Sequence, residues 1–377
     1  MISVCDTETT TFQKGNPFAR RNRLVYVGTY QPGQPLLALP ATEFFLQKPG
    51  LDASEFLVFF NAKFDLHWLR RNYGWAPSQK QRVWCCQLAH FLLTGQSSVY
   101  PSLEEVRTWN GVKRISPKGA LDYWARGIDT PDIPPEIMLE DLKNDVLDTY
   151  EIYLRQIEAF ASLPKLFNLF RLECDDLLVL AEMEWNGLAF NAEEAKRRAE
   201  QTRVEIGSIE QQLKDVWPSV PINFNSPTHI SALLYGGTID EDRKTLVGIY
   251  QSGGKVGQPR FKHEKIEHVL PQLCKPIEGT ELRKLGFYST DESILRQLNG
   301  AKDIRELLLK RSKLSKELDY LDGLPRLIDE MDWDVNTLHS SFNQCVAATG
   351  RLSSSKPNVQ NLTDGVLSLV ESRYESI

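Results

Sequence analysis

The sequence pattern changes once along the chain, near Pro164, and this change constrains the fold more than any other feature. Before it, short β-branched and aromatic runs alternate with helical patterns, which is typical of an α/β domain. After it, the pattern is one of long helices. The chain has 377 residues, enough for two or three domains that each bury a core. We therefore expect an α/β domain followed by a mostly α-helical one.

The expected elements follow from periodicity and from helix-stop residues. In the first part we expect strands at residues 2–6, 24–30 and 56–60, and helices at 64–71, 87–93 and 139–160. In the second part we expect helices at 166–186, 192–213 and 304–321. Residues 236–288 interrupt these helices, and a Gly253-Gly254 turn between β-like runs there predicts a hairpin.

Composition excludes some classes of protein. The apolar fraction of 41% and the charged fraction of 25% are typical of a soluble globular chain. The sequence lacks a run of about 18 apolar residues, so a membrane span is not expected. Six cysteines without a C-x-x-C pair predict reduced thiols and a cytoplasmic protein. Because Cys and His do not cluster, a structural zinc site is not expected. The net charge of −6 does not by itself indicate nucleic-acid binding.

The first acidic motif, Asp6-Thr-Glu8, stands at the end of the first expected strand. Because side chains alternate along a strand, both carboxylates share one face. Such a pair suits two divalent cations about 3.5–4 Å apart. The motif occurs often by chance, so its interpretation depends on the acidic motifs that follow.

The second motif runs from Asn61 to Asp65, and it places Asp65 in the first turn of an expected helix. Phe64, Leu66 and Trp68 surround this acid with apolar groups. A carboxylate in such surroundings needs a partner. The partner is either a metal ion or the positive end of the helix dipole.

The third motif is Asp141, Asp145 and Asp148, which fall at i, i+4 and i+7 of an expected helix. This spacing places all three on one face, where like charges repel. A cation at that face would relieve the repulsion.

Taken in order, the three motifs resemble those of the DEDD 3′–5′ exonuclease domain: D-x-E, then N-x-x-x-D, then a helix with a final Asp. The resemblance implies a ribonuclease H-like exonuclease domain over residues 1–165. It implies that two Mg²⁺ or Mn²⁺ ions bind at the site and that Asn61 contacts the substrate. The metal-binding carboxylates that it implies are Asp6, Glu8, Asp65 and Asp145.

The sequence departs from this resemblance at one position. Where the polymerase-type domain has a Tyr that orients the attacking water, four residues before the last Asp, this chain has Asp141. Where a related subtype has a His, five residues before, this chain has Glu140. Either Asp141 assists the catalytic water in another way, or the exonuclease activity is reduced.

A long motif at 347–362, A-A-T-G-R-L-S-S-S-K-P-N-V-Q-N-L, resembles the passage from thumb to palm in family A DNA polymerases. The resemblance implies contacts with the minor groove of a primer–template. Every correct base pair presents acceptors there at purine N3 and pyrimidine O2, so hydrogen-bond donors can test pair geometry without reading sequence. The expected donors are Arg351, Asn358, Gln360 and Asn361.

Three further stretches, at 183–191, 224–234 and 289–295, resemble thumb motifs of the same family. The resemblance implies a thumb over residues 166–338 and a truncated start of the palm over 339–377. A D-Y/F-S-x-x-E segment with the first palm carboxylate does not follow, so we expect the residues that catalyse nucleotidyl transfer to be absent from this chain.

The predicted hairpin is basic. Between Arg243 and Lys265 it has six basic residues against a single acid, Glu264. One interpretation is a contact with the DNA backbone through Lys255, Arg260 and Lys262, and the other is a solvated loop.

Together these resemblances predict the N-terminal part of a phage-type family A DNA polymerase that acts in DNA replication, in the cytoplasm of a bacterial host. It would proofread single-stranded 3′ ends and bind primer–template DNA. The rest of the palm and the fingers is expected either on a second polypeptide, which would be a partner of this chain, or to be lost. Two alternatives remain open: a non-catalytic DNA-binding subunit of a split polymerase, and a stand-alone 3′–5′ exonuclease.

Overall fold

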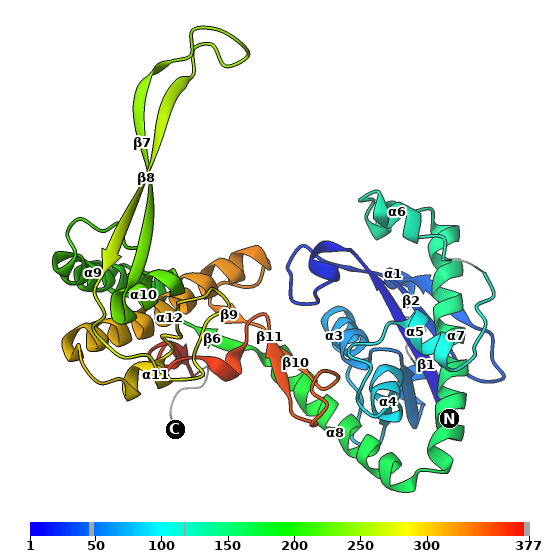
Figure 1. The fold of residues 1–377 in the computed structure, drawn as a ribbon. Coiled ribbons are helices and arrows are strands. Elements are labelled where there is room, and N and C mark those ends of the chain that lie inside the picture. Colours follow the sequence, from blue (N-terminus) through cyan, green and yellow to red (C-terminus); the bar gives the residue numbers. More distant parts are fainter. Residues whose placement is uncertain (45–48, 117, 373–377) are drawn as a thin grey trace. The chain divides into compact units, whose positions relative to one another are not determined.

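The computed structural model describes residues 1–44, 49–116 and 118–372, and it divides by contact into two units (Figure 1). The first unit comprises Met1–Glu193 and Gly323–Ile377, and the second is Glu194–Asp322. Residues 166–193 and 323–338, which the sequence assigns to a thumb, group with the first unit. The three-part functional division of the chain stays a prediction. The end of the predicted palm segment, 373–377, lies outside the described residues.

A mixed five-stranded sheet forms the centre of the first unit. The strand order is β3-β2-β1-β4-β5, in which β1, β2 and β3 pair antiparallel while β4 and β5 run parallel to β1. The three strands that the sequence predicts in this part are confirmed, whereas β3 and β5 are additional. The strands are β1 (Ile2–Thr9), β2 (Leu24–Tyr30), β3 (Leu37–Pro40), β4 (Phe56–Phe59) and β5 (Arg82–Cys85).

Helices pack around this sheet, and the four helices that the sequence predicts up to residue 186 are confirmed as α3, α4, α7 and α8. The longest of them, α7, packs against β1 and β2. The helices are α1 (Ala41–Phe44), α2 (Pro49–Asp52), α3 (Ala62–Tyr73), α4 (Cys86–Leu93), α5 (Leu103–Trp109), α6 (Leu121–Ala125), α7 (Pro135–Ala161) and α8 (Pro164–Asn186), with short 3₁₀ turns at Phe12–Lys14 and Thr130–Asp132.

A glycine allows α7 to lie close to the sheet. A Cβ atom added at Gly28 of β2 would stand 2.8 Å from Val146 Cγ2 and 2.9 Å from Leu142 Cγ. No side chain fits in that space. Because Asp145 precedes Val146, the close approach of α7 also sets where Asp145 meets the sheet.

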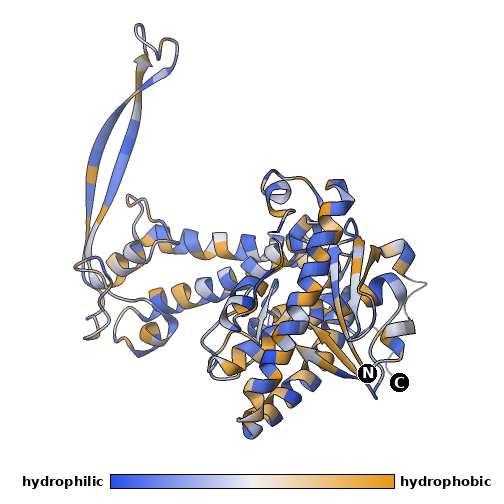
Figure 2. Ribbon diagram, turned by 90° about the vertical axis from the view of Figure 1, so that its right-hand side faces the viewer, coloured by the Kyte–Doolittle hydropathy of each residue, from blue (hydrophilic) through white to orange (hydrophobic). Residues whose placement is uncertain are grey.

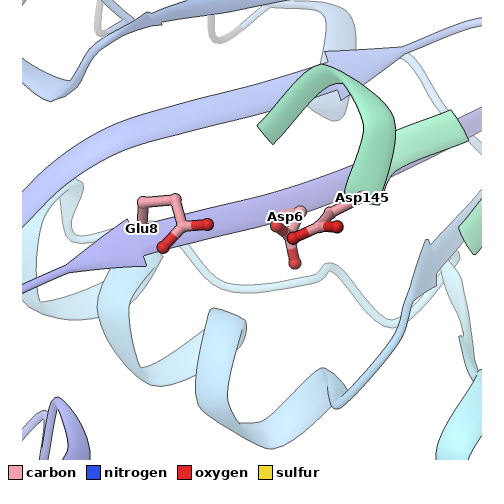
Figure 3. A group of neighbouring side chains, drawn as sticks. All are labelled: Asp6, Glu8 and Asp145. Atoms are coloured by element: carbon pink, nitrogen blue, oxygen red, sulfur yellow. The ribbon is translucent and has the colours of Figure 1, made fainter. Parts of the chain in front are cut away.

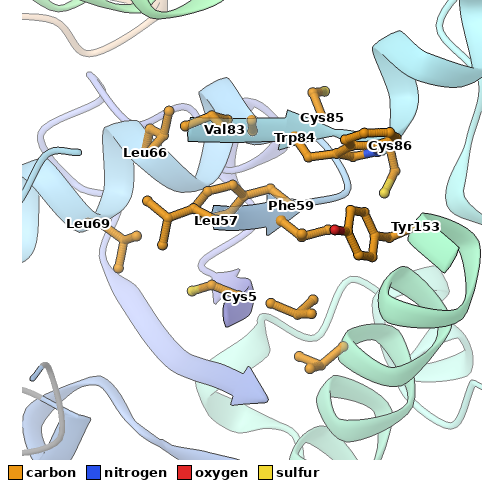
Figure 4. Packing of buried hydrophobic residues seen from close by; sticks show 14 of the residues in the cluster. Cys5, Leu57, Phe59, Leu66, Leu69, Val83, Trp84, Cys85, Cys86 and Tyr153 are labelled. Carbon is orange, nitrogen blue, oxygen red and sulfur yellow. The ribbon is translucent and has the colours of Figure 1, made fainter. Parts of the chain in front are cut away.

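The core of the first unit lies between the sheet and its helices (Figure 4). Leu57 and Phe59 from β4 are fully buried beside Leu69 of α3, and Trp84 of β5 meets Tyr153 of α7 edge to face at 5.0 Å. Burying side chains of this size contributes about 1.5–3 kcal/mol each. This core holds β1, α3 and α7, the three elements that carry the acidic motifs.

Small sheets complete the first unit by joining segments far apart in the sequence. One sheet has the order β12-β6-β9, and a second pairs β10 with β11. These elements are β6 (Leu188–Phe190), β9 (Thr337–Leu338), β10 (Ser341–Asn343), β11 (Ser353–Ser355), a 3₁₀ turn at Val359–Asn361, α13 (Asp364–Leu367) and β12 (Val370–Glu371).

The second unit has its own helical core and the predicted hairpin. The long helices expected at 192–213 and 304–321 are confirmed as α9 (Ala192–Val216) and α12 (Lys302–Glu330), which each run past the edge of the unit. Two short helices, α10 (Pro227–Tyr235) and α11 (Glu292–Gln297), pack between them. The hairpin is confirmed as β7 (Gly237–Ile249) and β8 (Pro259–Leu270). Hydrophilic and hydrophobic residues are mixed along it (Figure 2).

Two sequence expectations concern the whole chain. Among the helices that the structure describes, none is long and apolar enough to cross a membrane. All six cysteines lie buried with free thiols.

Candidate functional site

Three carboxylates from two elements converge at the centre of the sheet (Figure 3). Asp6 and Glu8 project from β1, and Asp145 projects from α7. Each offers an oxygen atom, and these atoms all lie within 4.8 Å of one another. The alternation of side chains along β1 puts the first two on one face, and the close packing of α7 on Gly28 brings the third to them.

This convergence is electrostatically unfavourable without a cation. Burial raises the pKa of Asp6 well above its usual value, and repulsion from Asp65 and Asp145 adds to the rise. Burial also raises the pKa of Glu8 to about 7, although the Lys118 ammonium opposes the rise. Bound divalent cations would remove both causes, because they supply positive charge where water has been excluded.

Asp65 lies in the first turn of α3, as predicted, with only 2% of its surface exposed. The Thr7 hydroxyl donates a hydrogen bond to its carboxylate at 2.7 Å. Burial raises the pKa of Asp65 to about 7 even though the bonds with Thr7 lower it. Asp65 is not one of the three mutually close carboxylates, yet its charge reaches Asp6. The sequence analysis expects a partner for the buried carboxylate of Asp65, and the Thr7 hydroxyl is one such partner.

The three aspartates of α7 share one face, as their spacing predicts. Basic side chains of the same chain lie against that face. The Arg114 guanidinium lies 3.4 Å from Asp141 and 3.2 Å from Asp148, and it also pairs with Asp145. The Lys118 ammonium lies 2.7 Å from the second oxygen of Asp145. Side chains therefore relieve the repulsion along this face.

Sequence reasoning missed both of these cations. The available signal was charge: residues 106–121 contain four basic residues and no acidic one. An isolated basic stretch upstream of an acidic helix face predicts pairing between the two.

Asp141, the residue at the position of the expected Tyr, is only 2% exposed. Its carboxylate accepts hydrogen bonds from the backbone N–H groups of Gly119 at 3.0 Å and Ala120 at 2.8 Å. It thus holds the loop that follows Lys118.

The donor set fits a hard divalent cation. All three converging groups are carboxylates, the ligands that Mg²⁺ and Mn²⁺ prefer. No hydrogen bond or ion pair to the side chains of Asp6 and Glu8 occurs among the described residues. Asp145 differs, because Arg114 and Lys118 already engage it.

Asn61 occupies the N-cap position of α3 with an exposed side chain that makes no capping hydrogen bond. It lines a cavity of about 220 Å³ together with Phe64, Gln87 and Tyr100. An amide in this position is free to bind a ligand.

A buried carboxylate, Glu184 of α8, joins the second acidic motif to the segment ahead of 347–362. Lys63 of α3 donates to it at 2.6 Å, and His67 lies at 2.9 Å. The Phe342 backbone N–H donates at 2.6 Å, and Lys63 also bonds to the Phe342 carbonyl. Burial alone would raise the pKa of Glu184, but bonds with His67 and the Lys63 charge lower it. His67 is buried in this contact.

The motif at 347–362 spans β11 and the 3₁₀ turn after it. Arg351, Gln360 and Asn361 are exposed. Asn358 begins the turn by accepting the Gln360 backbone N–H at 3.2 Å and the Ser354 hydroxyl at 3.1 Å. Asn358 therefore has a structural task in addition to any contact with a ligand.

The hairpin is less basic than its sequence suggests. Arg243 pairs with Glu241 at 3.0 Å, and the charge of Asp242 faces His263 at 2.9 Å. The three cations that the sequence singled out, Lys255, Arg260 and Lys262, are exposed, and so are Lys244 and Lys265.

Comparison with solved structures shows which fold this chain shares. The "POL domain of Pol1 from M. smegmatis complex with DNA primer-template and dNTP" superimposes with a TM-score of 0.63 at 17% identity, over 97% of this chain and 53% of that one. The chain therefore has the mixed α/β fold of a polymerase domain.

Sequence matches agree on one family of similar proteins. Residues 262–371 match the family described as "DNA polymerase family A". DNA polymerase I of Synechocystis is 26% identical over 251 residues, covering 64% of this chain and 21% of the relative. The thermostable DNA polymerase I of Thermus filiformis is 48% identical over 88 residues, covering 23% of this chain and 10% of the relative. Residues 262–371 are thus similar to DNA polymerase family A, and these two sequence matches span about a fifth or less of each relative's length.

Proposed function

We propose that this chain supplies the 3′–5′ exonuclease and primer–template-binding parts of a family A DNA polymerase. The observation that carries the nuclease assignment is the convergence of Asp6, Glu8 and Asp145 within 4.8 Å. Their order in the sequence, with Asn61 and Asp65 between, supports the same assignment. We propose further that the carboxylates of nucleotidyl transfer lie outside these 377 residues.

The sheet supports a ribonuclease H-like assignment for residues 1–165. Its order of β3-β2-β1-β4-β5 combines an antiparallel half with a parallel half, and the proposed ligands lie on the central strand β1 and on α7. The helical second unit with its hairpin corresponds to most of the proposed thumb. The segment from β10 onward corresponds to the proposed start of the palm.

The proposed reaction is hydrolysis of the last phosphodiester of a DNA strand. The water oxygen bonds to phosphorus, the bond to the 3′ oxygen breaks, that oxygen takes up a proton, and a 5′-mononucleotide leaves. Two Mg²⁺ or Mn²⁺ ions, when bound, activate water and stabilise the leaving oxygen. Asp6, Glu8 and Asp145 would hold these ions with Asp65, which Thr7 orients. The exposed Asn61 would bind the strand end.

The proposed primer–template contacts come from exposed donors. Arg351, Gln360 and Asn361 would reach minor-groove acceptors, while Asn358 stabilises the turn that carries them. Lys255, Arg260 and Lys262 of the hairpin would contact backbone phosphates, which neither require nor confer sequence specificity.

The test is a single-turnover assay on a single-stranded oligonucleotide with Mg²⁺ or Mn²⁺. Asp6→Asn and Asp145→Asn should each lower the rate by several orders of magnitude, because each removes a metal ligand. Asp122→Asn, a change at an exposed carboxylate of the same unit, is the matched control. Activity that persists in both site variants, or in EDTA, would refute the nuclease assignment.

One observation favours a second candidate, a DNA-binding chain without nuclease activity. Asp145 is already paired with Arg114 and Lys118. The same assay decides between the two, because wild-type protein without metal-dependent hydrolysis fits only the second.

A further inference from the structure

The loop ahead of α7 delivers two cations to the acidic site. Residues 114–116 and 118–120 contribute Arg114, whose guanidinium spans the aspartates of α7, and Lys118, whose ammonium is 2.7 Å from Asp145. Lys118 is 26% exposed, and its ammonium lies 5.2 Å from the centre of the Trp124 ring. It is therefore both fixed and accessible.

Asp141 fixes this loop. Its two carboxylate oxygens accept the backbone N–H groups of Gly119 and Ala120, and Arg114 lies 3.4 Å from the oxygen that accepts the Gly119 N–H. A carboxylate with its oxygens occupied in this way is poorly placed to orient water. Asp141 instead fixes the position of Lys118, because Lys118 directly precedes Gly119 and Ala120, whose N–H groups Asp141 binds.

We propose that Lys118 binds the scissile phosphate of the DNA strand and that Asp141 is the positioning residue that holds Lys118 in place. This inference rests on the proposed exonuclease function and adds to it. It gives Asp141, at the position of the expected Tyr, a role other than orienting water.

The chemistry of lysine limits the role. A charged ammonium group donates three hydrogen bonds and accepts none, so Lys118 cannot take a proton from water. It can neutralise charge on the non-bridging phosphate oxygens, where charge is spread in the transition state of phosphoryl transfer. An ammonium group 2.7 Å from Asp145 would lie within reach of a phosphate that metal ions on that carboxylate would hold.

The surroundings of Lys118 suit a negatively charged DNA strand. An open cavity of about 790 Å³ leads to Asp145, and most of the charged side chains that line it are basic. The charged and hydroxyl-bearing residues of its lining are Ser102, Glu104, Arg107, Lys113, Arg114, Ser116, Lys118 and Asp145.

The test measures product binding as well as hydrolysis. Thymidine 5′-monophosphate carries the phosphate that hydrolysis would release, and thymidine lacks it. By titration calorimetry in Mg²⁺, Lys118→Met should weaken binding of the monophosphate about tenfold or more and leave thymidine unchanged. Lys118→Arg should restore binding. Lys143→Met, a change at an exposed lysine of α7 that does not line this cavity, is the matched control.

Asp141 is tested through Lys118. Asp141→Ala should weaken monophosphate binding and lower the hydrolysis rate, and Asp141→Asn, which keeps one acceptor, should do so less. If Asp141 acts through Lys118, adding Asp141→Ala to Lys118→Met should cause no further loss. Circular dichroism of each variant verifies the fold. A full additional loss in the double variant would refute the positioning role.

The outcomes separate this inference from the proposed function. Wild-type hydrolysis with unchanged monophosphate binding in Lys118→Met overturns the role of Lys118 and leaves the nuclease assignment standing. Wild-type protein that hydrolyses no single-stranded DNA with either ion overturns both.

Discussion

Replacing Asp65 by Asn should make the metal-free protein more stable at neutral pH. Asp65 is 2% exposed, and burial raises its pKa from 3.8 to about 7. The Asn side chain has nearly the same shape, and its carbonyl oxygen can still accept the hydrogen bond from Thr7. The substitution therefore removes the charge and keeps the contact.

The sign follows from proton binding. Between about pH 4 and pH 7 the folded protein holds a proton on Asp65 that the unfolded chain has lost, so stability falls as pH rises through this range. A difference of about three pKa units corresponds to about 4 kcal/mol. Because Asp65 interacts electrostatically with Asp6 and Glu8, the three carboxylates share this cost in free energy. We expect Asp65→Asn to recover on the order of 2–4 kcal/mol above about pH 7 and almost nothing below about pH 4.

The assay is urea denaturation in EDTA, with the free energy of unfolding of wild-type and variant proteins measured from about pH 4 to about pH 8. Asp122→Asn, a change at an exposed carboxylate, is the control for the general effect of removing one acid. The gap between Asp65→Asn and wild type should widen with pH, and the control should show no such trend.

A gap that does not change with pH would refute the reasoning, because only a group that titrates differently in the folded and unfolded states produces the slope. A second series in saturating Mg²⁺ extends the test. If the cluster binds the ion, wild-type protein should gain stability at high pH and the gap should close or reverse.

Three further outcomes follow from the same structure. Glu184→Gln should destabilise the protein by about 3 kcal/mol or more in urea denaturation, because the Lys63 charge loses its buried partner. Arg351→Ala should weaken primer–template binding by about 1–3 kcal/mol, equally for every terminal base pair, in fluorescence anisotropy. Replacing three exposed cations near the hairpin turn, Lys255, Arg260 and Lys262, by Ala should lower the slope of log K against log salt for that binding by about three.

The sequence predicted the elements of the fold well where periodicity was strong. The long helices α7, α8, α9 and α12 and the β7–β8 hairpin all appear where their patterns indicated. Strands β3 and β5 were missed because Pro40 within β3 argues against a strand and because β5 passes directly into α4 without a turn residue between them. The grouping of 166–193 with the first unit depends on long-range contacts such as those of Glu184, which no local pattern shows.

The same distinction between local patterns and long-range contacts applies to the site residues. Alternation along one strand placed Asp6 and Glu8 together, and spacing on one helix placed the aspartates of α7 on one face, because both rules act within a single element. The pairing of Lys118 with Asp145 spans 27 residues and depends on how a loop folds back. Propensity does not encode such a path, so charge balance along the stretch was the only signal.

The departure at position 141 shows how the two kinds of information combine. From the sequence alone, an Asp where a Tyr is expected suggests either weaker catalysis or another way of handling water. In the structure the same Asp is bonded to the backbone of the loop that carries Lys118. A tyrosine cannot accept two backbone N–H bonds with two separate oxygens. Asp141 and Lys118 therefore act together, so replacing either one alone should impair the site.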